Sequence, residues 1–137
     1  MTEPLDHHDA LIYTMVTMSA VDRTVTDAEL ARIGEIVSHL PIFANYDDSK
    51  LVYASQVCGD ILGGDNGLQL MLELIRSATP STLRETAYAV ALEVAAADLS
   101  VPPEETRFLE MLADALELDR LTTTAIERGI RARNKVL

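Results

Sequence analysis

The sequence contains no tryptophan, a single cysteine, four tyrosines and two phenylalanines among its 137 residues. The lone Cys58 excludes an internal disulfide and fits a reducing compartment, so we expect a cytoplasmic protein. No apolar run approaches the roughly 20 residues of a membrane-spanning helix, and the first residues lack the basic and apolar regions of a secretory signal. Peripheral association with a membrane stays open.

Basic residues are also scarce, because 11 lysines and arginines stand against 22 aspartates and glutamates and give a net charge of −11. Such a charge repels the phosphate backbone of nucleic acids, whereas it attracts metal cations and basic surfaces. Four cations lie close together near the end of the chain: Arg128, Arg131, Arg133 and Lys135. We interpret them as the end of a helix, where cations complement the helix dipole, with a docking role as the alternative.

Alanine, leucine and methionine, which are good helix formers, dominate the hydrophobic residues of the chain. No stretch alternates apolar and polar residues, so no strand is predicted. We expect an all-α fold, a compact bundle of about seven helices joined by short linkers, forming a single domain over residues 1–137. The predicted helices span residues 5–21, 27–39, 48–62, 66–78, 81–97, 103–117 and 120–134. The nearly apolar helix 81–97 is expected to lie centrally in the core.

Capping residues and breakers define several helix ends. Thr26 followed by Glu29 predicts a capping box at the start of the second helix, and Pro41 ends that helix. Asp119 is a suitable N-cap for the last helix. The glycine-rich segment 63–67 is interpreted as a turn between helices rather than a phosphate loop, since no strand precedes it and no lysine follows it.

An internal repeat relates residues 19–29 to residues 95–105 at a constant offset of 76. Within these segments, Asp22 matches Asp98, Val25 matches Val101 and Glu29 matches Glu105. The register continues into the next helix, where Ile33, Ile36 and Leu40 match Leu109, Leu112 and Leu116. We therefore predict a duplicated helical hairpin with an acidic elbow in each copy.

The acidic elbows could bind a metal ion. Asp22 follows the C-terminal end of a predicted helix, where the dipole is negative and a carboxylate is unfavourable unless something offsets it. Carboxylates and free carbonyl oxygens are hard ligands that suit Ca²⁺ or Mg²⁺, and Glu29 or Asp27 could complete the coordination. The second copy offers Asp98, Glu104 and Glu105. The spacing excludes an EF-hand. Alternatively, the two aspartates accept amide hydrogen bonds within their turns and Glu29 serves only the capping box.

The pattern Asp-x-x-Val-x-x-x-Glu, present at residues 22–29 and again at 98–105, resembles the TerB-like tellurite-resistance proteins. The resemblance covers about residues 5–120. It implies a bundle of about seven helices and a non-enzymatic, stress-associated role, with Asp22, Glu29, Asp98 and Glu105 as the residues that bind metal cations. One departure is that Arg23 and Leu99 stand where the family usually has glycine after the aspartate, and Arg23 adds a positive charge beside the first proposed site.

The remaining candidates indicate no enzyme, because no nucleophile–base pair and no cofactor motif emerges. His7, His8 and Asp9 are expected at an exposed, fraying terminus, and Cys58 is expected to be a buried, inert thiol. Glu93 either faces the Asp98 turn or points to solvent. The competing function is a plain protein-interaction scaffold without a metal site. The protein partners and the oligomeric state are not specified by these residues.

Overall fold

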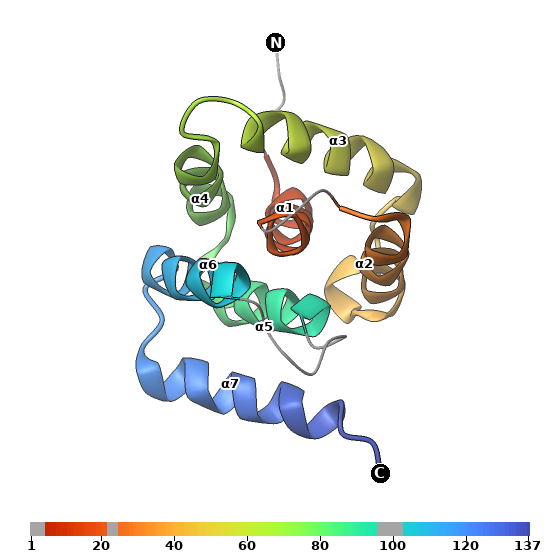
Figure 1. Ribbon diagram of the computed structural model, residues 1–137. Helices are drawn as coiled ribbons and strands as arrows, with labels where there is room; N and C mark the ends of the chain where they lie inside the picture. The colour runs from red at the N-terminus through yellow and green to blue at the C-terminus, as the bar shows by residue number, and fades with distance from the viewer. Residues whose placement is uncertain (1–4, 22–24, 96–102) are drawn as a thin grey trace.

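A computed structural model of the chain describes residues 5–21, 25–95 and 103–137, which contain seven α-helices, three short 3-10 helices and no strand (Figure 1). The α-helices are α1 (His7–Ala20), α2 (Asp27–His39), α3 (Leu51–Leu62), α4 (Gly67–Ala78), α5 (Arg84–Ala95), α6 (Pro103–Ala115) and α7 (Arg120–Arg133). The 3-10 helices span Pro41–Phe43, Asp48–Lys50 and Ser81–Leu83. The all-α prediction is confirmed.

Helix α1 occupies the centre of the bundle, with the other helices except α7 arranged around it (Figure 1). Every residue from Ala10 to Ser19 is buried, including the hydroxyl side chains of Thr14, Thr17 and Ser19. The Thr14 hydroxyl donates a hydrogen bond to the Ala10 carbonyl oxygen at 2.8 Å, so its burial leaves no unpaired donor. Helix α5, expected at the centre, contributes six buried residues and packs along α1.

The predicted helix ends are confirmed where capping residues were recognised. Thr26 Oγ1 accepts a hydrogen bond from the Glu29 amide at 3.1 Å, and Glu29 Oε1 accepts one from the Thr26 amide at 3.2 Å. Asp119 accepts a hydrogen bond from the Thr122 amide at 2.7 Å. Two predicted helices, 48–62 and 81–97, begin too early, because their first residues form 3-10 turns.

The glycine-rich segment 63–67 forms the turn from α3 into α4, as predicted. Asn66 adopts the left-handed conformation, with φ of 53°. Gly67 is buried directly against the end of α3, and a Cβ atom built on it would meet the carbonyl oxygens of Ile61 and Leu62. The turn therefore requires a residue without a side chain at this position.

The two hairpins that the repeat predicts correspond to α1–α2 and α5–α6. Helices α2 and α6 each have 13 residues, and their bounds differ by the same offset of 76. Each of them contacts both α1 and α5, which pack against each other. The elbows at residues 22–24 and 96–102 lie outside the described residues, so the duplication stays a prediction that the helical parts of the hairpins support.

Candidate functional site

Of the four predicted metal ligands, the structure describes two. Glu29 lies in the first turn of α2 and Glu105 lies at the matching position in the first turn of α6, and both are half-buried. Asp22 and Asp98 lie outside the described residues. In the described part of the chain, no group of three or more histidine, cysteine, aspartate or glutamate side chains is arranged to hold a metal ion.

The capping role of Glu29 is confirmed by its geometry. Its Oε1 atom accepts hydrogen bonds from both the amide and the hydroxyl of Thr26, at 3.2 and 2.9 Å. This reciprocal bonding satisfies backbone donors that the start of a helix leaves unpaired. The capping box is therefore one role of the Glu29 carboxylate, and its metal-binding role stays a prediction.

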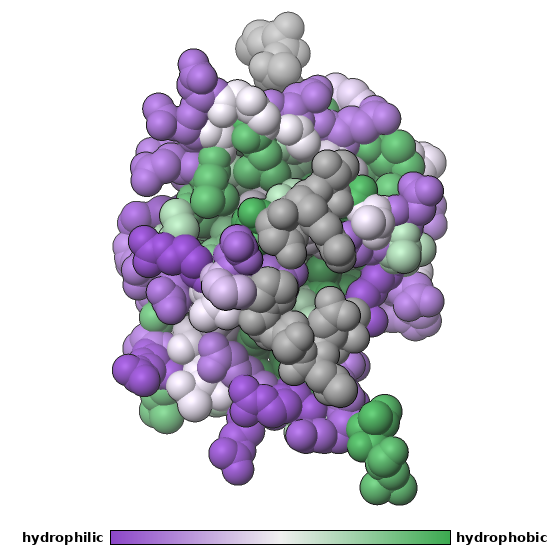
Figure 2. Space-filling view, viewed as in Figure 1, coloured by the Kyte–Doolittle hydropathy of each residue, from purple (hydrophilic) through white to green (hydrophobic). Residues whose placement is uncertain are grey.

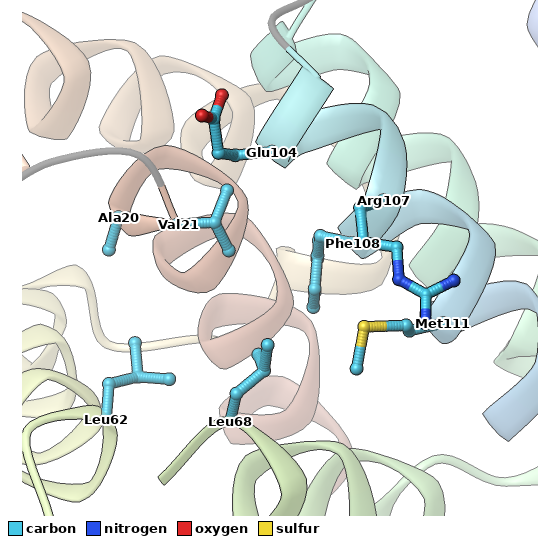
Figure 3. Close-up of a pocket in the computed structure, with 8 residues that line it drawn as sticks. All are labelled: Ala20, Val21, Leu62, Leu68, Glu104, Arg107, Phe108 and Met111. Atoms are coloured by element: carbon cyan, nitrogen blue, oxygen red, sulfur yellow. The ribbon is translucent and has the colours of Figure 1, made fainter.

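The structure does bring the flanks of the two elbows together around one cleft of about 340 Å³ (Figure 3). Ala20 and Val21, just before the first elbow, lie on one side of it, and Glu104, just after the second elbow, lies at its edge. The remaining wall is formed by Leu62, Leu68, Arg107, Phe108 and Met111. The wall is mostly apolar, so the cleft carries polar groups only on the α6 side.

Glu93 does not point to solvent, which was one of the two positions that the sequence left open, and the other, facing the Asp98 turn, involves residues outside the described part of the chain. Its side chain is 18% exposed and faces α7, where Arg133 Nη1 lies 3.2 Å from Glu93 Oε1. The Glu93 backbone carbonyl oxygen accepts two hydrogen bonds from Arg32 of α2, from Nε at 3.1 Å and from Nη2 at 2.7 Å. Both arginines come from distant parts of the chain, so no local pattern indicated these contacts.

Together these residues line a second cleft of about 350 Å³ between α2, α5 and α7. Its polar members are Arg32, Glu35, His39, Thr86, Glu93 and Arg133. Positive and negative side chains are mixed, and the Arg32 guanidinium is already bound to the end of α5. We therefore interpret this cleft as a junction of helices rather than as a ligand site.

The predicted fraying of the N-terminal histidines is wrong for His8. Its ring stacks on Phe43, and its Nε2 donates a hydrogen bond to the Ile42 carbonyl oxygen at 2.8 Å. Asp6 and Asp9 form a capping box that begins α1 at His7. The terminus is therefore held by a contact with a segment more than 30 residues away, which the local sequence does not encode.

Cys58 is confirmed as a buried thiol. Burial raises its pKa to about 11, while a contact with the Thr17 hydroxyl at 3.6 Å lowers the pKa slightly. Because the thiolate is the reactive form, a thiol that stays protonated at neutral pH is a poor nucleophile.

The arrangement of the other helices around α1 defines an all-helical bundle. The family model described as "Tellurite resistance protein TerB" matches residues 8–128, and the chain belongs to this family. Searches of curated proteins and of solved structures gave no significant match. No helix in the described part of the chain is long and apolar enough to cross a membrane.

Proposed function

We propose that this TerB-family chain is a non-catalytic, stress-associated module that binds a divalent cation, Ca²⁺ or Mg²⁺, at its two acidic elbows. Asp22, Glu29, Asp98 and Glu105 are the proposed ligands. The observation that carries the proposal is the matched placement of Glu29 and Glu105 in the first turns of α2 and α6.

Electrostatics support a cation at this end of the bundle. Helix α1 has no basic residue in its last turn, so no cation within this helix offsets the negative end of its dipole. The chain has a net charge of −11, which raises the local concentration of divalent cations. The matched, half-buried positions of Glu29 and Glu105 provide one carboxylate beside each elbow.

A protein-interaction scaffold without a metal site is the second candidate. It is favoured by the capping box, which already occupies Oε1 of Glu29 with two hydrogen bonds. In that case the acidic elbows serve only to begin helices.

Calorimetric titration of the purified chain with CaCl₂, MgCl₂ and ZnCl₂ distinguishes the two candidates. We expect heat of binding for Ca²⁺ or Mg²⁺ with the unmodified chain and its loss in the variant Asp22→Asn/Asp98→Asn. The matched control is Glu73→Gln/Glu85→Gln, which removes the same charge from two exposed positions on α4 and α5. If the unmodified chain gives no heat with any of the ions, the scaffold function replaces the cation-binding one.

A further inference from the structure

Helix α7 forms an outer layer on the bundle and packs chiefly against α5 (Figure 1). None of its 14 residues is buried. Two polar contacts fasten it, a hydrogen bond of 2.6 Å from the Tyr88 hydroxyl to Glu127 Oε1 and the ion pair between Arg133 and Glu93. One face of α7 is therefore held on the bundle, and the opposite face has no partner in the described structure.

The outward face of α7 is regular. Leu121, Ala125, Arg128 and Ala132 follow one another at intervals of four, three and four residues, so they lie along one side of the helix, and all four are exposed. Leu121 is 82% exposed. Beyond the helix, Val136 is 84% exposed. Figure 2 shows hydrophilic side chains where α7 lies and the apolar C-terminal end projecting beside them.

The charge of this segment is opposite to that of the rest of the chain. Residues 120–137 contain five basic residues and one acidic residue, a net charge of +4, whereas residues 1–119 carry a net charge of −15. Glu127 and Arg133 are already engaged within the bundle. The other four cations have no ion pair among the described residues: Arg120, Arg128, Arg131 and Lys135.

The family match ends at residue 128, so the second half of this basic segment lies outside the matched range. Arg131, Lys135 and Val136 all follow that boundary.

We propose that the outward face of α7 and the residues that follow it bind an anionic lipid surface. Exposed cations flanked by large apolar side chains at both ends suit a lipid interface, where each apolar side chain can insert without a complementary groove. Three of the six exposed large hydrophobic residues in the described part of the chain lie in this segment: Leu121, Val136 and Leu137.

Distance and salt weaken the repulsion between the acidic body and an anionic lipid surface. A helix is about 10 Å across, so α7 separates the rest of the bundle from the lipid by about that distance. This separation exceeds the Debye length of about 8 Å at physiological ionic strength. The four unpaired cations thus act on the surface directly, while the charges behind α7 are attenuated.

The test is co-sedimentation of the full chain with lipid vesicles. We expect binding to vesicles of equal parts phosphatidylcholine and phosphatidylglycerol, no binding to pure phosphatidylcholine, and release at high salt. Each cation near an anionic surface strengthens binding about fivefold, so Arg128→Gln/Arg131→Gln/Lys135→Gln should lower the partition coefficient by roughly 100-fold.

The control variant is Lys50→Gln/Arg76→Gln/Arg107→Gln, which removes three exposed cations from other faces and should leave the partition coefficient within about twofold. Thermal unfolding followed by circular dichroism verifies that both variants are folded. The proposal is overturned if the unmodified chain ignores anionic vesicles or if both variants lose binding equally. Salt-sensitive self-association that depends on the three α7 cations, without lipid binding, would assign this surface to a second copy of the chain instead.

Discussion

Replacing Arg32 with methionine should destabilise the fold far more than its position on a solvent-facing helix suggests. Arg32 reaches from α2 to the Glu93 carbonyl oxygen, which lies close to Ala95, the last residue of α5 that the structure describes. Two donors of one guanidinium, at 3.1 and 2.7 Å, bind this oxygen. The substitution keeps a long apolar side chain and removes only the charged donors.

The magnitude follows from the two effects that are lost. Hydrogen bonds from a charged group contribute about 1.5–3 kcal/mol, and a cation at the negative end of a helix dipole contributes about 0.3–1 kcal/mol. Since these effects overlap, we expect the free energy of unfolding to fall by about 2–3 kcal/mol. For a chain of this length, the melting temperature should fall by roughly 6–12 °C.

The measurement is urea unfolding followed by circular dichroism, with Arg107→Met as the matched control. Arg107 is 71% exposed and pairs with Glu110 at 3.5 Å, so its replacement should change the free energy of unfolding by less than about 0.5 kcal/mol. A second variant, Glu93→Gln, removes the carboxylate that Arg133 contacts but keeps the backbone carbonyl. The effect of Arg32→Met should therefore be unchanged in the Glu93→Gln background.

Two results would refute this reasoning. If Arg32→Met is no more destabilising than Arg107→Met, the guanidinium does not contribute as a cap. If its effect disappears in the Glu93→Gln background, Arg32 acts through the carboxylate and not through the end of α5.

Two further predictions concern Gly67 and Cys58. Gly67→Ala should destabilise the chain by about 2 kcal/mol or more because its Cβ would meet backbone carbonyl oxygens, whereas Gly59→Ala, with nothing within 4 Å, should stabilise α3 by about 0.5–1 kcal/mol. Equal effects in urea unfolding would contradict the packing at Gly67. Burial raises the pKa of Cys58 from 9.0 to about 11, so its contribution to stability is complete below pH 9 and is lost as the pH rises to 11. The unmodified chain should lose about 2–3 kcal/mol more than Cys58→Ala over that range, and parallel pH profiles of the two proteins would exclude this linkage.

Local chemistry made several features predictable. The Thr26–Glu29 capping box depends on residues three positions apart, and its hydrogen bonds form as the spacing requires. The turn at residues 63–67 was recognisable because glycine and asparagine are typical turn residues, and Asn66 adopts the left-handed conformation there. The 3-10 turns at 48–50 and 81–83 could not be distinguished from the first turns of α-helices, because the two kinds of turn share the same apolar spacing over so few residues.

The candidate site was predictable only in part. The repeat placed Glu29 and Glu105 at the starts of two helices, and the structure has them there. That the flanks of both elbows line one cleft could not be foreseen, because it depends on how α1 and α6 pack. The metal ligands themselves stay a prediction.

The amino-acid sequence alone determined the all-α class, most helix ends and the family, since these depend on helix periodicity, on capping residues a few positions apart and on a motif. Tertiary structure alone decided that α1 is central, that His8 binds Ile42, and that Glu93 lies between Arg32 and Arg133. These contacts join residues 34 to 61 positions apart, so their partners are selected by the packing of whole helices. The outward face of α7 depends on both the sequence and the tertiary structure, because the sequence supplies its cations and the packing on α5 decides which of them face outward.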